Sequence, residues 1–172
     1  MKTLLALFSL ILAGCAGYTV GPIKPTPMKQ VNRIAVRNWR NDTLEPRVSV
    51  LLTTMIIKQL QQDGTYEITD ESRADAILDG TLTAIDRRPV RSLRGNILAT
   101  REYQLTLRGR YTLTEKGTGR VIDERKVNGV TSFFVTGRSL VAADSNQDER
   151  QALPLAIEEL ATRLTSNISE GW

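Results

Sequence analysis

The 172-residue sequence predicts an α+β fold: a two-layer α/β sandwich, in which two helices cover one face of a small mixed or antiparallel sheet of about four or five strands. Three observations support this fold class. Residues 102–113 alternate between apolar and polar side chains, which is typical of a strand with one buried face. Two segments, near residues 45–60 and 146–168, carry apolar residues at helical spacing. Helices with one apolar face need a sheet to cover.

The first strand and the first helix follow one another directly. Residues 31–36 predict a short strand, and a polar, turn-prone segment follows it. We expect the helix to begin near Thr43 or Glu45, with Pro46 in its first turn, and to end at Gly64 as a left-handed cap. The apolar stripe of this helix consists of Val48, Leu51, Leu52, Met55, Ile56 and Leu60.

Four more strands are expected between the two helices. A short one lies at residues 66–68, and a longer one at residues 76–85 places Leu78, Leu82 and Ala84 on one face. The alternating strand at residues 102–113 comes next.

A turn at residues 115–119 then leads into a return strand at residues 120–134. Because Phe133 and Phe134 are adjacent in this strand, one of them faces the core and the other faces outward, where it is a possible contact.

The last helix is expected to open near Ser145 or Asn146, with acidic residues close to its positive end. Pro154 lies in the first turn of this helix or kinks it. The apolar stripe consists of Leu153, Ile157, Leu160, Ala161, Leu164 and Ile168.

Composition excludes several classes of function. The chain has no histidine and one cysteine, so a Ser-His-Asp or Cys-His catalytic site is impossible and a zinc site of the usual type is nearly so. No phosphate-binding loop and no conspicuous pair of carboxylates is present, so we expect no enzyme, no metal and no non-covalent cofactor. The formal net charge of +4 is too small to indicate a nucleic-acid partner.

The N-terminus resembles the signal peptide of bacterial lipoproteins. Lys2 precedes an apolar run that ends in Leu12-Ala13-Gly14-Cys15, which resembles a lipobox. This implies a signal peptide at residues 1–14 and a lipid-modified Cys15 as the mature N-terminus. Residues 15–30 then form a tether rich in glycine and proline, and residues 31–172 form a single domain. The alternative is a buried free cysteine in an ordinary secreted protein. By the usual sorting rule, Ala16 favours the outer membrane.

An arginine cluster between two expected strands is a candidate ligand site. Its members are Arg87, Arg88, Arg91, Arg94 and Arg101. Pro89 and Gly95 mark the segment as a loop. Planar guanidinium groups suit phosphate and carboxylate groups, so this loop is a candidate site for a phosphorylated lipid head group. The alternative is a solvated hairpin tip.

Two further features are candidate partner contacts. Arg108 and Arg110 lie on the polar face of the alternating strand, which either faces solvent or docks a partner. Trp39 follows the first strand and is either a binding anchor or a lid over the end of the core.

Several segments in order resemble the lipopolysaccharide-assembly lipoproteins of the LptE family, and the likeness covers nearly the whole mature chain. They are CAGY at residues 15–18, IAV at 34–36, NDTLEPR at 41–47, DGTY at 63–66, ADAILDG at 74–80, the strand at 103–113 and VNG at 127–129.

The resemblance implies two helices on a small sheet and a non-catalytic protein, anchored in the outer membrane on its periplasmic side. It implies that the chain binds lipopolysaccharide and serves as the plug of an LptD-like β-barrel during export to the outer leaflet. The arginine cluster would then meet lipopolysaccharide phosphates, and the polar sheet face the barrel lumen. Some segments also resemble other periplasmic interaction lipoproteins, such as peptidoglycan-synthase activators and the curli-secretion lipoprotein.

Overall fold

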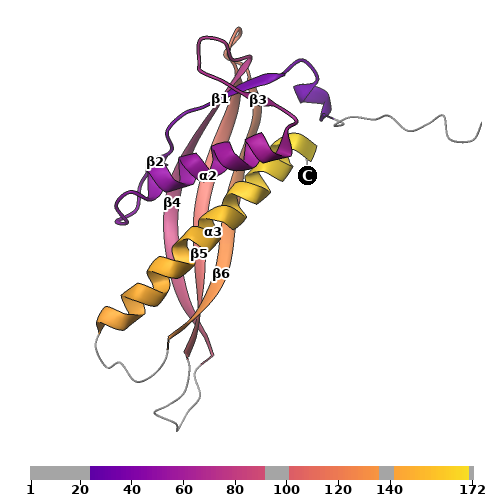
Figure 1. Ribbon diagram of the computed structural model, residues 1–172. Helices are drawn as coiled ribbons and strands as arrows, with labels where there is room; N and C mark the ends of the chain where they lie inside the picture. The colour runs from indigo at the N-terminus through magenta and orange to yellow at the C-terminus, as the bar shows by residue number, and fades with distance from the viewer. Residues whose placement is uncertain (1–23, 92–100, 136–141, 171–172) are drawn as a thin grey trace, which may run out of the picture.

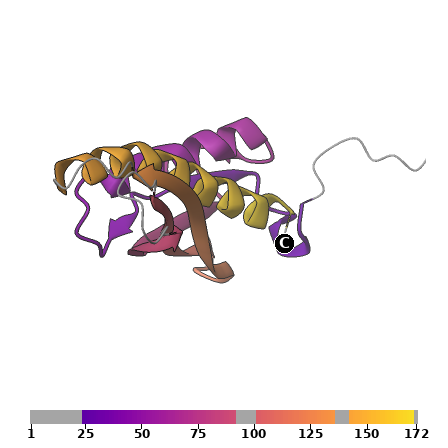
Figure 2. The same ribbon diagram turned by 90° about the horizontal axis from the view of Figure 1, so that it is seen from below.

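Both helices lie on the same face of one sheet, as the sequence predicts (Figures 1 and 2). The computed structural model describes residues 24–91, 101–135 and 142–170. The elements in chain order are the 3-10 helix η2 (Thr26–Met28), β1 (Arg33–Val36), β2 (Arg40–Asn41), α2 (Val48–Asp63), β3 (Glu67–Ile68), β4 (Ala76–Arg91), β5 (Arg101–Glu115), β6 (Val121–Val135) and α3 (Ala142–Glu170).

The sheet is mixed and contains six strands in the described part of the chain, in the order β3-β1-β4-β5-β6, with β2 also paired to β4. Parallel pairing joins β1 to β3, and both β1 and β2 to β4. The three long strands β4, β5 and β6 pair antiparallel. The fold class is therefore confirmed, and the sheet has one strand more than expected, because the segment predicted as a polar turn contains the two-residue strand β2.

The alternating pattern of β5 divides the sheet into two faces. Leu105, Leu107 and Leu113 have no exposed surface and pack toward the helices, whereas Arg108 and Arg110 point to the opposite face and are exposed. We call this second face, which neither helix covers, the open face. It positions the candidate site described below.

Three glycines form a diagonal row on the helix-facing side of the long strands. A Cβ atom on Gly80 would lie 2.3 Å from Cε2 of Trp39, and one on Gly109 would lie 2.8 Å from Cζ3 of the same ring. On β6, a Cβ atom on Gly129 would lie 2.0 Å from the carbonyl oxygen of Ala156 in α3. The sequence places glycine where the Trp39 ring and the α3 backbone approach the sheet most closely.

Helix α2 begins later than predicted, at Val48 rather than near Thr43 or Glu45. The preceding segment forms a loop because Asn41 accepts a hydrogen bond from the backbone of Thr43 at 3.0 Å and donates one to the carbonyl of Glu45 at 2.8 Å. Arg47 then enters the helix with a left-handed backbone, φ 65°. The predicted cap is confirmed: Gly64 has φ 72° and donates to the carbonyl of Leu60.

A β-bulge in β4 changes which side chains face the helices. The pairing with β5 shifts between Leu82 and Ala84, so that Thr83 is the extra residue of the bulge. Thr83 and Ala84 therefore both lie on the open face of the sheet. Ala84 therefore faces the open side opposite Arg108, and the prediction that it shares a face with Leu82 is wrong. Beyond the bulge, Ile85 and Arg87 take the helix-facing positions, opposite residues of β5 that are buried.

Helix α3 begins at Ala142, before the predicted start at Ser145 or Asn146. Pro154 consequently lies inside the helix rather than in its first turn. The predicted apolar stripe is confirmed, since Ile157, Leu160 and Leu164 have no exposed surface.

Across residues 24–91, 101–135 and 142–170, no helix is both long enough and apolar enough to cross a membrane.

Candidate functional site: the open sheet face

The structure divides the predicted arginine cluster. Arg87 and Arg88 lie within β4, Arg91 is its last residue and Arg101 is the first residue of β5, so the prediction that they share a loop is wrong. The reason is that β4 continues to pair with β5 far beyond the predicted end of the strand. Arg94 lies outside the described residues.

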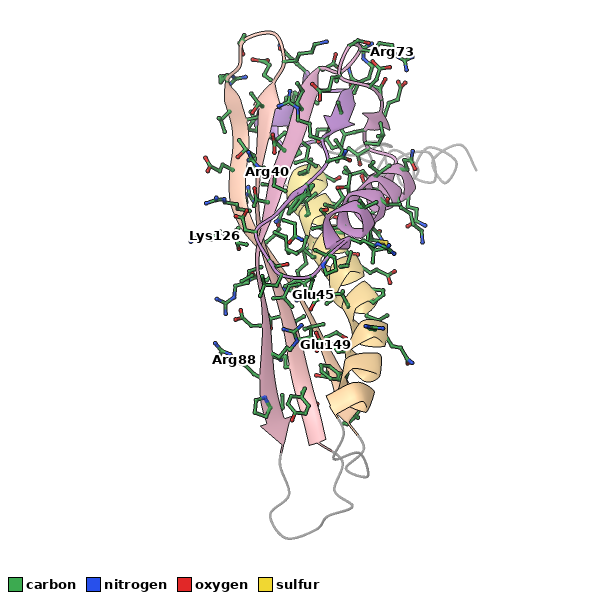
Figure 3. All side chains as sticks on the ribbon, turned by 90° about the vertical axis from the view of Figure 1, so that its left-hand side faces the viewer. Arg40, Glu45, Arg73, Arg88, Lys126 and Glu149 are labelled. Carbon is green, nitrogen blue, oxygen red and sulfur yellow. The ribbon has the colours of Figure 1, made fainter. Side chains whose placement is uncertain are left out.

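Arg87 faces the helix layer and is held by two carboxylates. Its Nη2 donates to Glu45 at 2.8 Å and also contacts Glu149, to which its Nε donates at 2.5 Å. The hydrogen bond to Glu149 raises the pKa of the guanidinium, and the charge of Glu45 adds to this. Figure 3 shows Glu45 and Glu149 between the sheet and α3. Arg87 therefore joins β4, α3 and the loop before α2, and its charge is already compensated.

Arg88 has the opposite orientation. Its side chain is exposed on the open face, away from the helices (Figure 3), and it forms no ion pair with a described residue. Arg88 is therefore available to a ligand, while the side chains of Arg91 and Arg101 lie outside the described part of the structure.

A transverse row of cations crosses the open face near its middle. Arg40 of β2 is level with Thr81 of β4, Thr81 is opposite Arg110 of β5, and Arg110 is opposite Lys126 of β6. The Nε of Arg40 donates to the hydroxyl of Thr81 at 3.3 Å, so both side chains lie on the same face. Since neighbouring strands are about 4.8 Å apart, the row spans about 14 Å. We call Arg40, Arg110 and Lys126 the cationic row.

The charges of the cationic row are only weakly compensated. Arg40 approaches Asp79 at 3.7 Å, and its side chain is 73% exposed. Arg110 and Lys126 are exposed and form no ion pair with any residue in the described ranges. In contrast, the neighbouring Arg108 is paired with Asp86 at 3.1 Å.

A shallow groove of about 490 Å³ lies on the open face beside the cationic row. Four cations and three carboxylates line it: Arg37, Arg40, Arg110, Lys116, Asp79, Glu115 and Glu124. Arg37, which lines the groove, is held in place because its guanidinium donates two hydrogen bonds to the carboxylate of Glu71, each at 2.9 Å. These hydrogen bonds raise the pKa of Arg37. The same hydrogen bonds lower the pKa of Glu71. The groove is open, so it suits the charged part of a larger ligand.

Trp39 is not a surface residue. Its side chain is 2% exposed and lies on Gly80 and Gly109, and its backbone N–H donates to the hydroxyl of Thr53 in α2 at 3.0 Å. The assignment of Trp39 as a partner contact therefore needs correction, and it serves as the lid between sheet and helix that the sequence left as the other alternative.

Cys15, the predicted site of lipid attachment, lies outside the described residues. Its role stays a prediction from the sequence.

Sequence reasoning missed two members of the cationic row. Lys126 lies at an outward position of β6, and the alternation of that strand was the available signal. No local signal marks Arg40, because its place beside Arg110 arises only from the parallel pairing of β2 with β4.

These features define a class of protein: an α+β domain with a polar, cation-bearing sheet face that neither helix covers. Within the described ranges, no three His, Cys, Asp or Glu side chains gather in a way that could hold a metal ion.

The chain belongs to the LptE family, because the family model described as lipopolysaccharide-assembly matches residues 31–168. This places it in a family of envelope lipoproteins with a role in lipopolysaccharide assembly. No curated protein matches the sequence.

Solved structures of low sequence identity share the fold. A lipoprotein from Caulobacter crescentus CB15 aligns with a TM-score of 0.52 and 14% identity, over 80% of this chain and 89% of that one. The minor lipoprotein from Acinetobacter baumannii aligns with a TM-score of 0.51 and 17% identity, over 82% and 92%. A protein from Xanthomonas campestris aligns with a TM-score of 0.50 and 13% identity, over 89% and 90%.

Proposed function

We propose that this chain binds lipopolysaccharide and serves as the plug and assembly partner of an LptD-like β-barrel, which exports lipopolysaccharide to the outer leaflet. In this proposal the lipid on Cys15 anchors the chain to the periplasmic side of the outer membrane. The observation that carries the proposal is the cationic row on the uncovered face of the sheet, in a chain that belongs to a lipopolysaccharide-assembly family.

The chemistry of the row suits a ligand with several phosphate groups. Arginine offers a planar fork of donors to a phosphate, and lysine adds a mobile point charge. Arg110 and Lys126 have no carboxylate to displace among the described residues, so a phosphate would not have to break an ion pair to reach them. Arg88 offers a third such cation further along the same face.

The rest of the open face suits a polar wall. Thr106, Thr112 and Thr114 are partly exposed between the charged residues of β5. The interior of a membrane β-barrel is polar, so a face of this kind is compatible with a position inside one. Arg108 stays a proposed partner contact, whereas Arg110, which the sequence analysis also predicted as a partner contact, is assigned to lipopolysaccharide because it belongs to the cationic row. Arg91, Arg94 and Arg101 stay proposed contacts of lipopolysaccharide.

The experiment compares lipopolysaccharide binding by two charge-matched double variants of the purified full chain. In Arg110→Ala/Lys126→Ala the cationic row loses two charges. In Lys58→Ala/Arg150→Ala the chain loses the same charge from exposed positions on the helices. We expect the first variant to raise the Kd about tenfold or more, equal to ~1.4 kcal/mol, and the second to change it less than about twofold.

The dependence of binding on salt concentration further distinguishes direct contact between the cationic row and phosphates from attraction by the net charge of the chain. If the row contacts phosphates directly, its removal lowers the sensitivity of binding to ionic strength, because fewer charge contacts remain to be screened. Equal loss of binding in both double variants would contradict the assignment of the row and indicate attraction by net charge alone.

A further inference from the structure

Three of the seven large apolar side chains that are exposed among the described residues lie between residues 44 and 51. They are Leu44 in the loop between β2 and α2, and Val50 and Leu51 in the first turn of α2. The other four are scattered over three elements: Val90 of β4, Val121 and Phe134 of β6, and Leu155 of α3. Exposed apolar side chains that gather at one place mark an interaction site, whereas single ones are ordinary.

Leu44 is the most exposed of these side chains, although hydrogen bonds hold the loop that carries it. Its exposed surface is that of a leucine in an extended peptide. Before it, the side chain of Asn41 accepts hydrogen bonds from the backbone N–H of Thr43 at 3.0 Å and from the Thr43 hydroxyl at 2.7 Å. After it, the backbone N–H of Glu45 donates to the Thr43 hydroxyl at 3.3 Å, and the carbonyl of Glu45 accepts from Asn41 at 2.8 Å. The loop therefore presents Leu44 in a fixed position.

The same loop is fastened to the sheet and projects beside the start of α2 (Figure 1). The backbone N–H of Asp42 donates to the carbonyl of Leu82 in β4 at 3.0 Å, and the carboxylate of Glu45 accepts from Arg87 at 2.8 Å. A side chain on a rigid support loses little conformational entropy when a partner covers it, so more of the free energy of its burial appears as affinity.

The charges around Leu44 suit a contact with a protein. Asp42 and Arg47 flank it in the sequence, and both are exposed and form no ion pair with a residue in the described ranges. An apolar residue at the centre of a ring of polar groups is typical of the residues that contribute most to protein–protein affinity.

We propose that Leu44 is the anchor by which this chain docks into an apolar pocket of its protein partner, with Val50 and Leu51 at the margin of the same contact. This inference rests on the proposed function, in which the partner is an LptD-like β-barrel. The anchor includes no residue of the cationic row, so the chain can hold the barrel and lipopolysaccharide at the same time.

Lipids fit this site less well than a protein does. The two flanking charges have opposite signs, so they do not form a site for phosphate groups. Three apolar side chains also bury less apolar surface than one myristoyl chain, which by itself gives only marginal membrane binding.

Competition between two differently tagged full chains in the same cells tests the anchor. One chain is the wild type and the other carries Leu44→Ser, and each is purified from detergent-solubilised outer membranes after expression at equal levels. We expect Leu44→Ser to retain about tenfold less barrel than the wild type, equal to ~1.4 kcal/mol. Leu155→Ser makes the same chemical change at an exposed position of α3 and should retain the barrel within about twofold of the wild type. Equal losses in the two variants would contradict a specific anchor at Leu44.

A second variant tests whether the loop has to be rigid. Asn41→Ala removes the hydrogen bonds to Thr43 and Glu45 and keeps Leu44. We expect it to reduce the retained barrel about threefold, because the loop then has to be ordered on binding. An unchanged amount would contradict the role of the fixed loop.

Lipopolysaccharide binding by the purified full chain separates this inference from the proposed function. Leu44→Ser should change neither the Kd for lipopolysaccharide nor the unfolding temperature, since Leu44 is fully exposed. A weaker affinity for lipopolysaccharide would assign the loop to the lipid and overturn the inference. Equal retention of the barrel by Leu44→Ser and the wild type would overturn the inference alone, whereas a wild-type chain that retains no barrel would overturn the proposed function as well.

Discussion

Single residues explain how closely the two layers approach each other. The row Gly80, Gly109 and Gly129 gives the helix-facing side of the long strands a shallow trough. The ring of Trp39 fills one end of the trough, and the backbone of α3 at Ala156 fills the other. Glycine is required at these positions by space, not by an unusual φ, since none of the three has a positive value.

We predict that Gly129→Ala destabilises the protein by about 2–3 kcal/mol, because its Cβ would meet backbone atoms of α3 that cannot move independently. Gly117→Ala is the matched control, since no atom lies within 4 Å of its added Cβ and its φ is not positive. The control should change the free energy of unfolding by less than about 0.5 kcal/mol. Urea unfolding followed by circular dichroism measures both; equal stability of the two variants would contradict the close packing at Gly129.

Asp75 makes stability depend on pH. Its carboxylate accepts hydrogen bonds from the guanidinium of Arg33 at 2.8 Å and from the backbone N–H groups of Asn32 and Arg33, and these lower its pKa to about 2. A lowered pKa means that the stabilisation is complete above the unfolded value near 4 and is lost as the pH falls toward 2. We predict that Asp75→Asn is less stable than the wild type by on the order of 1–2 kcal/mol at pH 6. The difference should shrink toward zero at pH 2, and a constant difference across that range would argue against an ionised Asp75.

Among the elements, the bulge in β4 determines which arginines of the predicted cluster face the helices and which face the open side of the sheet. A strand without the bulge would continue the alternation of Leu78 and Leu82 and would place Arg88 toward the helices. The inserted position instead turns Arg87 toward Glu45 and Glu149 and leaves Arg88 on the open face. No residue pattern in the sequence announces the bulge, so the sequence alone could not separate the two arginines.

We predict that Arg87→Ala loosens the start of α3 without weakening lipopolysaccharide binding. Hydrogen exchange of backbone amides near Glu149 and Glu45 should accelerate, while global stability falls by less than about 1 kcal/mol because the ion pairs are partly exposed. Arg88→Ala is the control, with the same charge change on the other face and no effect on exchange in α3. Loss of binding in Arg87→Ala alone would contradict the structural role of this residue.

The periodic spacing of apolar residues in the sequence, every second residue in strands and every third or fourth in helices, was enough to predict most of the fold. The alternation of β5 and the apolar stripes of α2 and α3 depend on local spacing, so the two-layer class, the strands and the cap at Gly64 could be predicted. The length of β4, the start of α2 and the cationic row depend on pairing between distant segments, such as Arg40 with Thr81. Such long-range register leaves no local mark in a single sequence.

For the molecule as a whole, the sequence predicts an anchor that is separate from the folded domain. Among the described residues the buried core begins at Met28, and the predicted lipid site at Cys15 precedes it in the sequence. We predict that Cys15→Ser leaves the folded domain intact and mislocalises it. Membrane fractionation should find the variant outside the outer membrane, and circular dichroism should find an unchanged unfolding temperature. An unfolded variant would contradict the separation of anchor and core.

Purification of the full chain from detergent-solubilised outer membranes tests the proposed role beside a membrane-embedded partner in lipopolysaccharide export. We expect an LptD-like β-barrel to co-purify in a fixed ratio, with lipopolysaccharide in the complex. Recovery of a peptidoglycan synthase in place of the barrel, at the same fixed ratio, would contradict it and favour the other class of interaction lipoprotein.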